Sequence, residues 1–528
     1  MRKAECVSQF RYNRAIMTPV CIIGLDGVDW RLLRGWLSAL PTLARLCAEG
    51  TTGNLRSTIR PESSVAWSSF ATGVNPGKHG VYGFMVQTSP GRFQIANGAT
   101  IRTARFWETL SAAGRRVALL NVPFTYPVRP INGALISGMM TPGLHADFAY
   151  PPELKSAFVA RFPAYPFDPD SSHKTASAVS ASVEQTTEQQ LDAALWLLQR
   201  EAWDCFGVVF TGPDRLQHFA WNGPDRLLAH YRQLDAAVAK ILAQLPADAL
   251  TLIISDHGFN GVAGRFYGNQ WLAENGWLRF KAGASRGSLL LKGVRKAQKI
   301  GWLRELKRHV LPAEVGASSL AASQFGARID WANTRAYFAP DGGVHVNLRG
   351  REPHGIVVDY AATRAQLQSE LAAICRNDVP LFANVFTRDE LYAGDVFDGA
   401  PDLVAEPQRE TATTHFVLDS SAKPQPSPFG DATPYQATHA LDGILIAHGT
   451  NVATGSLNAN IIDIAPTVLA VQGVAVPDNV DGRPLVELFA EPPEIAYQAT
   501  GDVVQDGAQS ADDAAVAERL RQLGYIDS

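Results

Sequence analysis

Three segments of the sequence place a carboxylate, a histidine or both directly after a run of apolar residues. Asp26 ends the run CIIGLD, and the pair Asp256-His257 follows LTLIIS. In FTGPDRLQHF, Asp214 and His218 are four residues apart, a spacing that puts both side chains on one face of a helix's first turn. Read one at a time, these residues could be turn formers, a helix N-terminal charge and a surface histidine. Together they offer the carboxylate and imidazole groups that bind divalent metal ions.

His439 and a serine-rich stretch complete this set. His439 precedes the apolar run of ATHALDGILIAHG, and a single histidine would be weak evidence by itself. In STIRPESSVAWSSFATG, Ser63 or Ser64 could simply cap the helix that contains residues 66–71. The same place at a helix N-terminus favours an anion, which suits a nucleophilic hydroxyl. Three carboxylates, three histidines and one hydroxyl are enough ligands for two divalent ions with mixed nitrogen and oxygen coordination.

The elements that must position these residues follow an alternating pattern. Short apolar runs such as VCIIGLDG, RRVALLNVPF, CFGVVFTGPD and DGILIAHG are separated by helical patterns, for example at 189–200 and 224–245. Strands alternating with helices predict an α/β fold with a mainly parallel central sheet and helices on both faces. Buried parallel strands are expected to be continuously apolar, as these runs are. Ligands of such sheets gather at the carboxyl ends of the strands, which is where most of the candidate residues fall.

One long stretch interrupts this rhythm and divides the chain into four parts. Residues 17–260 are predicted to form the first part of the catalytic core, and residues 431–490 its last part. Between them, residues 261–430 carry short strand-like pieces and are interpreted as an inserted cap or lid. Its basic segment, 286–309, could contact an anionic substrate, form a solvated helix face or lie on a membrane surface. Residues 491–528 are predicted to be a polar linker and a C-terminal helix that packs back on the body.

Bulk composition narrows the class of protein. The chain has 528 residues, is 46% hydrophobic and carries a net charge of only −4, which does not favour nucleic-acid binding. The five cysteines are scattered without a CxxC pair, so neither a disulfide framework nor a thiolate zinc site is expected. No apolar run has the length of a signal peptide core or a membrane span, so we expect a cytoplasmic protein. Met17 precedes the first strand, so residues 1–16 are interpreted as an extension or a misassigned start.

The order and spacing of these motifs resemble the alkaline phosphatase superfamily, and within it the type I phosphodiesterase/nucleotide pyrophosphatase branch. The resemblance covers nearly the whole chain and includes NVPFTYPV, YGNQWLAENGWL and DIAPTVLAVQGVAVPDNVDGRPL. It implies an alkaline-phosphatase-like three-layer sandwich with an inserted cap. It also implies two divalent metal ions, Zn²⁺ as the first expectation and Mn²⁺ as the second. The implied substrate is a small-molecule phosphate ester.

The resemblance further assigns roles to individual residues. It implies that one metal is bound by Asp214, His218 and His439. It implies that the other is bound by Asp26, Asp256, His257 and the nucleophile, Ser63. The family nucleophile lies ten residues before the glycine of a Thr-Gly pair, here Thr72-Gly73, which selects Ser63 and leaves Ser64 as the second choice.

The sequence departs from the nucleotide pyrophosphatases at one position. They carry an Asn three residues after the nucleophile that helps to hold the phosphoryl oxygens, whereas this chain has Ala66. Lys78, Arg60 and Arg215 are candidate substitutes, although a structural or surface charge is the favoured interpretation of each. His79 is interpreted as a loop-fixing residue and not as a ligand.

The predicted function is therefore a two-metal-dependent phosphohydrolase, in particular a phosphodiesterase, that acts through Ser63 and a phosphoserine intermediate. A phosphomutase with the same metals and serine is an alternative. A sulfatase would need Pro and Arg where this chain has Val65 and Trp67. A catalytically inactive protein that binds a phosphorylated ligand is a third alternative, which the complete set of metal-site residues disfavours.

Overall fold

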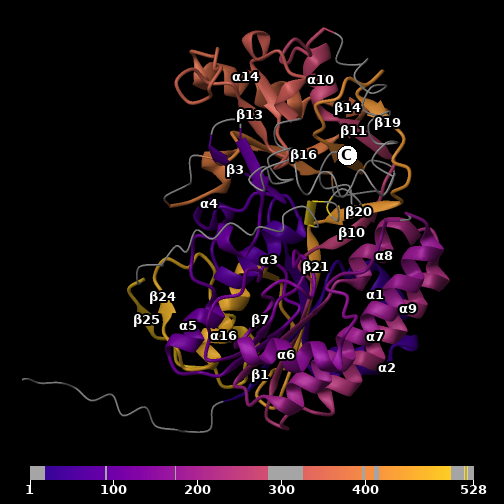
Figure 1. The fold of residues 1–528 in the computed structure, drawn as a ribbon, viewed down its shortest axis with the longest axis vertical. Coiled ribbons are helices and arrows are strands. Elements are labelled where there is room, and N and C mark those ends of the chain that lie inside the picture. The colour runs from indigo at the N-terminus through magenta and orange to yellow at the C-terminus, as the bar shows by residue number, and fades with distance from the viewer. Residues whose placement is uncertain are drawn as a thin grey trace, which may run out of the picture.

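The computed structural model describes residues 18–89, 92–172, 174–282, 325–394, 399–408 and 415–500, together with Val516, Ala517 and Leu520. In this part of the chain, ten strands form one central sheet in the order β22-β2-β21-β9-β1-β8-β5-β6-β7, with β23 also paired to β2 (Figure 1). Their bounds are β1 Val20–Leu25, β2 Thr51–Arg56, β5 Val117–Leu120, β6 Gly133–Ile136, β7 Ala149–Tyr150, β8 Cys205–Phe210, β9 Leu250–Ile254, β21 Asp442–His448, β22 Gly455–Ser456 and β23 Ala459–Asn460.

The sheet is mixed and mainly parallel. Strands β9, β1, β8, β5 and β6 pair in parallel, while β21 runs antiparallel to both β9 and β2, and β7 runs antiparallel to β6. The reversal of β21 has a topological cause. The chain leaves the sheet at the carboxyl end of β9 and returns from the inserted region at the same edge. It must therefore enter β21 in the opposite direction.

Helices cover both faces of the sheet, as the alternation of β1 demonstrates. Cys21, Ile23 and Leu25 belong to one buried apolar cluster, and Val20 and Ile22 belong to another, because successive strand residues point to opposite faces. The first cluster is covered by α1 Trp30–Trp36, α2 Pro41–Glu49, α6 Pro152–Arg161, α7 Ala176–Arg200 and α9 Pro224–Leu242; the second by α3 Ser63–Thr72, α5 Phe106–Ala112 and α16 Ile464–Val471. The α/β fold and its three layers, as expected from the sequence, are confirmed.

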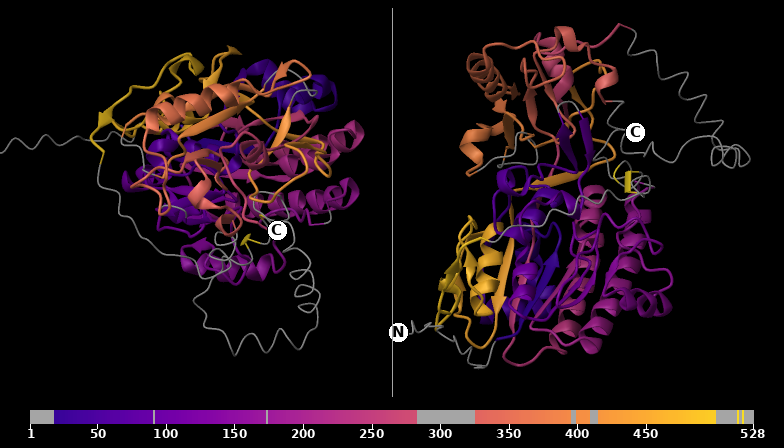
Figure 2. Two further views of the ribbon diagram at one scale, coloured as in Figure 1. Left: turned by 90° about the horizontal axis from the view of Figure 1, so that it is seen from above. Right: turned by 60° about the vertical axis from the view of Figure 1, so that its left-hand side comes forward.

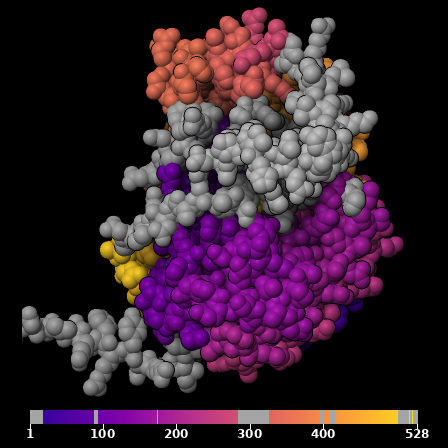
Figure 3. All heavy atoms as spheres, in the orientation of Figure 1, coloured from indigo at the N-terminus to yellow at the C-terminus, as the bar shows by residue number. Residues whose placement is uncertain are grey.

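The inserted region forms a second body above the carboxyl edge of the sheet, visible at the top of Figure 1 and of the right-hand view of Figure 2, and as the orange spheres at the top of Figure 3. It contains a three-stranded sheet, β18-β11-β19, and a four-stranded sheet, β12-β13-β17-β16. Its elements are β11 Gly264–Tyr267, α10 Gly268–Glu274, β12 Ala336–Phe338, β13 Val344–Val346, α14 Tyr360–Ala372, β16 Phe382–Thr387, β17 Leu403–Pro407, β18 Phe416–Asp419 and β19 Phe429–Gly430.

The apolar cluster of this upper body draws on several parts of the chain. It takes in the hairpin of β3 (Met85–Ser89) and β4 (Arg92–Ile95), which the sequence division places in the first core part, and Val516, Ala517 and Leu520 near the C-terminus. The basic segment 286–309 and most of the linker and C-terminal helix predicted at 491–528 lie outside the described residues. The four-part division of the chain stays a prediction. Among the described residues, no helix has both the length and the apolar character needed to cross a membrane.

A short ribbon joins the two bodies. Strand β10 (Gly258–Gly261) leaves the core directly after His257, and β20 (Ala437–Ala440) leads back into it. The two strands pair antiparallel, with Phe259 opposite His439. The ends of the insertion are therefore fixed side by side whatever its length, and residues nearly two hundred positions apart meet at the carboxyl edge of the sheet.

Candidate metal centre

The predicted metal ligands converge at the carboxyl edge of the central sheet. Asp26 follows β1, Asp256 and His257 follow β9, and His439 lies on β20. Asp214 and His218 lie on α8 (Gly212–Ala220), the helix that begins just after β8, and their four-residue spacing turns both inward. All six side chains are buried, with at most 6% of each residue exposed.

The first group consists of Asp214, His218 and His439. The Nε2 atoms of His218 and His439 are 3.1 Å apart, and Asp214 Oδ1 lies 3.2 Å from His439 Nε2 and 3.6 Å from His218 Nε2. Ligand atoms at about 2.0–2.1 Å from a tetrahedral zinc ion are about 3.3 Å from one another. The spacing of the three atoms therefore fits a shared divalent ion.

The second group surrounds Nε2 of His257. Asp26 Oδ1 lies 3.7 Å from it, Asp256 Oδ2 3.4 Å and the hydroxyl oxygen of Ser63 3.2 Å. Asp214 Oδ1 lies 3.8 Å from the same nitrogen. Asp214 therefore borders both groups, whereas the family resemblance assigns it to the first alone. Within the described residues, the combinations Asp214–His218–His439 and Asp26–Asp214–His257 each bring three ligand atoms within 4.8 Å of one another.

Each of the three aspartates has one oxygen bound within the protein and one oxygen without a hydrogen-bond donor. Asp26 Oδ2 accepts from the indole N–H of Trp67 at 3.0 Å, and Asp256 Oδ1 accepts from the backbone N–H of Gly27 at 3.3 Å. Asp214 Oδ2 is bound by the guanidinium of Arg215. The other oxygens, Asp26 Oδ1, Asp214 Oδ1 and Asp256 Oδ2, are buried and have no hydrogen-bond donor among the described residues. Buried carboxylate oxygens are costly unless paired, so this arrangement fits bound cations.

The histidines are oriented in the same way. His218 Nδ1 lies 3.1 Å from the carbonyl oxygen of Ala437, and His257 Nδ1 lies 3.1 Å from that of Gly258. A carbonyl can only accept, so Nδ1 carries the proton in both rings and Nε2 keeps its lone pair. A donor to a backbone carbonyl on the far nitrogen is the usual support of a metal-bound histidine.

Burial gives these groups unequal charges in the protein without its ions. It raises the pKa of Asp26 to about 8, with Asp214 adding to the rise, and it holds the pKa of Asp256 well above its usual value. Burial also opposes the charge of Asp214, but Arg215 and the histidines hold its pKa well below the usual range. Burial lowers the pKa of His218 to about 4 and holds the pKa of His257 well below its usual value, so both rings are neutral at pH 7. Neutral imidazoles beside carboxylates favour cations at this site.

Ser63 and Ser64 differ in their surroundings. Ser63 is the first residue of α3, and its hydroxyl faces Nε2 of His257. The Ser64 hydroxyl is buried and has no hydrogen-bond partner among the described residues. Of the two serines, Ser63 is thus the one in contact with the predicted metal ligands.

The cations considered as substitutes for the missing Asn are engaged elsewhere. Lys78 contacts Asp481 and donates to the carbonyl of Asn479 at 2.8 Å. Arg60 donates to the carbonyl of Asp341 in the cap at 2.8 Å. Arg215 is fully buried, and besides Asp214 it contacts Asp168 at 3.1 Å, so it orients a metal ligand.

His79 lies apart from the metal ligands. Its Nδ1 accepts from the backbone N–H of Val81 at 3.1 Å, so Nε2 carries the proton and donates to the Ser69 hydroxyl at 2.9 Å. Burial lowers the pKa of His79 to about 3. A neutral ring bound on both nitrogens holds the loop after α4 (Pro76–His79).

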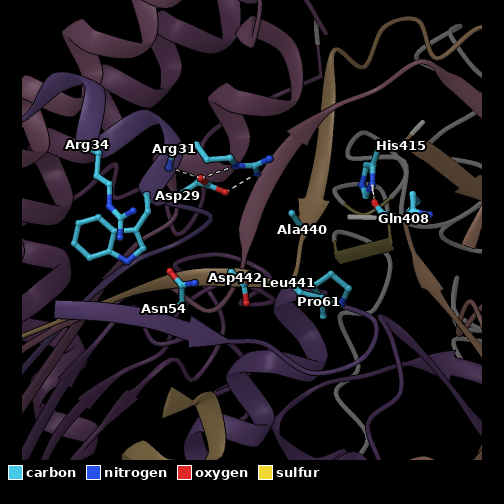
Figure 4. A pocket seen from close by; sticks show the side chains of 11 residues that line it. Asp29, Arg31, Arg34, Asn54, Pro61, Gln408, His415, Ala440, Leu441 and Asp442 are labelled. Carbon is cyan, nitrogen blue, oxygen red and sulfur yellow. Dashed lines mark hydrogen bonds and ion pairs between the residues drawn. The ribbon is translucent and has the colours of Figure 1, made fainter. Parts of the chain in front are cut away.

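A separate cavity of about 400 Å³ lies behind β20 (Figure 4). Ala440 lines it, and because neighbouring residues of a strand point to opposite faces, His439 faces away from it toward the metal ligands. On one side Asp29 binds Arg31, and on the other His415 contacts the carbonyls of Gln408 and His439, each at 2.9 Å. His415 thus supports the backbone of a predicted ligand from behind.

The sequence motifs did not reveal the residues that orient the ligands. Trp67 holds Asp26, and Asp168 holds Arg215, which in turn holds Asp214. Trp67 lies four residues after Ser63 on α3, a spacing that could have placed it on the same helix face. Asp168 lies in an irregular segment between α6 and α7, where no periodicity marks it.

Comparison with known proteins places the chain in a family. Residues 20–420 match the family described as type I phosphodiesterase / nucleotide pyrophosphatase. The protein is thus a member of the type I phosphodiesterase/nucleotide pyrophosphatase family, in the alkaline phosphatase superfamily. No curated protein matches the sequence.

Two solved structures share the fold at low sequence identity. Phosphonoacetate hydrolase from Sinorhizobium meliloti 1021, solved in complex with phosphonoformate, has a TM-score of 0.52 and 16% identity, covering 86% of this chain and 96% of that one. Murine ectonucleotide pyrophosphatase/phosphodiesterase 5 has a TM-score of 0.50 and 9% identity, covering 87% of this chain and 95% of that one. At these identities the likeness concerns the fold.

Proposed function

We propose that this phosphoryl hydrolase is a two-metal-dependent phosphodiesterase that acts through Ser63. One observation carries the proposal. Three buried aspartate oxygens without a donor, three imidazole nitrogens and one serine hydroxyl meet at the carboxyl edge of the sheet. That donor set suits hard or borderline divalent ions and leaves a hydroxyl beside them.

The two groups differ in composition, which bears on the metal. Asp214, His218 and His439 would hold one ion, and this nitrogen-rich set suits Zn²⁺. Asp26, Asp256 and His257 would hold the other with Ser63, and this carboxylate-rich set admits Mn²⁺ as well as Zn²⁺. When bound, such ions polarise the phosphoryl oxygens and favour the ionised form of a coordinated hydroxyl.

In the proposed reaction Ser63 is the nucleophile. Its Oγ forms a bond to phosphorus while the bond from phosphorus to the leaving oxygen breaks; the hydroxyl proton ends on the leaving oxygen, which yields an alcohol and a phosphoserine that keeps the second ester group. Water then attacks phosphorus, the Oγ–P bond breaks, Ser63 regains a proton from that water, and a phosphate monoester is released. Placement at the first turn of α3 supports the role, since a helix N-terminus stabilises an anionic phosphoryl group.

The preference for diesters has a charge argument. A monoester brings a dianion, whose additional charged oxygen needs a positive group beyond the two metals. Lys78 and Arg60 bind partners away from the centre, and Arg215 is committed to Asp168 and Asp214. A diester carries a single negative charge and needs less compensation.

The test compares the hydrolysis of bis-p-nitrophenyl phosphate and p-nitrophenyl phosphate by one zinc-loaded preparation. We expect a higher kcat/KM for the diester and loss of both activities in excess chelator. A monoester preference of tenfold, about 1.4 kcal/mol of transition-state discrimination, would reject the diesterase assignment. Full activity in chelator would reject metal dependence.

A further inference from the structure

Two cations flank an aromatic ring beside the first metal group. The ring of Tyr435 makes an edge contact with the imidazole of His218, with centroids 5.7 Å apart. The amine of Lys174 lies 5.9 Å from the centre of the Tyr435 ring, and the guanidinium of Arg265 lies 5.6 Å from it. One aromatic ring therefore separates two positive side chains from a predicted metal ligand.

Lys174 has no counterion among the residues that the structure describes. Its amine makes no hydrogen bond or ion pair with any described residue, although the side chain is partly buried. Burial lowers the pKa of Lys174, and the nearby Arg265 lowers it further. Arg265 itself is paired with Asp419 at 2.9 Å, so the uncompensated charge belongs to Lys174. An anion bound beside the two cations would offset the repulsion between them.

The segment that carries Lys174 is fixed to the metal centre. Asp168 begins it and binds Arg215, the residue that also holds the metal-ligand candidate Asp214. Lys174 ends it in a left-handed conformation, with φ of 51°, and its backbone N–H donates to the carbonyl of Ser171 at 3.0 Å. A non-glycine residue in this region of φ is uncommon and indicates a position held by its surroundings.

We propose that Lys174, with Arg265 beside it, forms a subsite for a second anionic group carried by the leaving part of the substrate. The proposal rests on the proposed function for its direction. Ser63 lies against His257, whereas His218 and His439 contact each other in the other group. In the proposed reaction the leaving oxygen departs opposite Ser63, so we assign the side of His218 and His439 to the leaving part. The substrate class is thus a phosphate ester whose leaving group bears a carboxylate or a further phosphate.

A second lysine, Lys155, also lies over an aromatic ring but is not part of the proposed subsite. The amine of Lys155 also lies 5.9 Å from an aromatic centre, that of Phe148, but it binds Asp147 at 2.9 Å. Lys155 therefore combines its contact with a ring with an ion pair to a carboxylate. The difference at Lys174 is the missing anion, and Lys155 supplies a matched control.

The test measures binding, which does not depend on turnover. Zinc-loaded protein is titrated by calorimetry with four phosphonates: benzylphosphonate, its para-carboxy derivative, the methyl ester of that derivative, and para-xylylenediphosphonate. We expect the two probes with a second anion to bind about tenfold more tightly than the two without one, the size of a hydrogen bond to a charged group. Lys174→Met should remove this difference and Lys174→Arg should keep most of it, while Lys155→Met leaves it unchanged.

The outcomes separate the subsite from the reaction. A greater gain for the carboxylate or for the diphosphonate identifies which anion the site takes. Equal affinities of all four probes for the wild-type protein, absence of binding, or an equal loss for all four in Lys174→Met would overturn the subsite. Failure to hydrolyse bis-p-nitrophenyl phosphate, with the binding difference intact, would overturn the proposed function and leave the subsite standing.

Discussion

Ser63 and Ser64 are adjacent on α3, equally buried, and different in what their hydroxyls meet. Ser63 faces His257, whereas Ser64 has no partner among the described residues. We expect Ser63→Ala to abolish turnover and to leave metal content largely intact, because three protein ligands of that site remain. Ser64→Ala is the matched control and should keep most of the activity. We would measure the turnover rate and the metal content of both variants on parallel preparations. These values show which of the two serines is needed for turnover. Loss of activity in Ser64→Ala alone would shift the nucleophile by one residue.

Arg215 shows how a residue without a substrate contact can determine the chemistry. Its planar guanidinium binds Asp168 and Asp214 at once, which turns the other oxygen of Asp214 toward the histidines. Lysine presents a point charge and cannot reproduce this geometry. We expect Arg215→Lys to weaken zinc binding by about 10–100-fold, as is typical for the loss of a group that orients a ligand. A competition titration against a chromogenic chelator measures it, and unchanged affinity would show that Asp214 is held by other contacts.

At the scale of elements, the sequence predicted the positions that local patterns determine. Buried strands can be recognised in the sequence as apolar runs. Residues that directly follow such runs, such as Asp26 and Asp256, could therefore be placed at the carboxyl edge of the sheet. The inward turn of Asp214 with His218 follows from helical spacing. The approach of His439 could not be read locally, because it depends on the pairing of β10 with β20. The reversal of β21 and the contacts of Trp67 and Arg215 likewise depend on tertiary structure.

Arg60 joins the segment just before α3 to the upper body. Arg60, in a left-handed conformation with φ of 42°, pairs with Glu62, the residue just before α3, and donates to the carbonyl of Asp341 in the turn between β12 and β13. Gly342 follows in that turn, and a Cβ atom on it would lie 1.0 Å from the Arg60 guanidinium. The absence of a side chain at Gly342 is therefore what admits Arg60.

We accordingly expect Arg60→Ala and Gly342→Ala to reduce kcat/KM through the same contact. Each should cost about 1.5–3 kcal/mol, the range for a hydrogen bond to a charged group. Because they remove one interaction, the double variant should cost little more than either single variant, which a double-mutant cycle measures. Gly350→Ala is the control, since Gly350 has a similar φ of +86° with open space around its Cβ position. Additive losses would show that the two residues act separately.

At the scale of the whole molecule, we expect the buried carboxyl groups of the candidate metal centre to make stability depend on pH. The metal-free protein holds the pKa of Asp26 at about 8, above its ordinary value of 3.8. A carboxyl group with a raised pKa in the folded state contributes stability that is complete below pH 4 and is lost as pH rises toward 8. Bound cations reverse this dependence of stability on pH, because they favour the ionised form of the Asp26 carboxyl group. The metal-free and metal-loaded proteins should therefore diverge in Tm as pH rises.

Asp256→Asn tests whether three carboxylates destabilise the metal-free molecule, since burial and its two aspartate neighbours hold the pKa of Asp256 well above normal. At pH 8 without metal, we expect the variant to melt above the wild-type protein, because asparagine has no carboxyl group whose ionisation favours the unfolded chain. With zinc at a hundredfold excess over its Kd, the wild-type protein should gain about 2.7 kcal/mol per occupied site, and the variant should gain less because it lacks a ligand. The order of the two melting temperatures should therefore reverse on addition of zinc. At pH 5 the metal-free difference should shrink, because ionisation of Asp256 in the unfolded chain, where its pKa is near the ordinary 3.8, then favours unfolding much less than at pH 8. Scanning calorimetry with chelator or zinc at the two pH values provides the four comparisons.

A metal-free variant less stable than wild type at pH 8 would mean that Asp256 is held mainly by the backbone N–H of Gly27, and that its charge is accommodated without a cation.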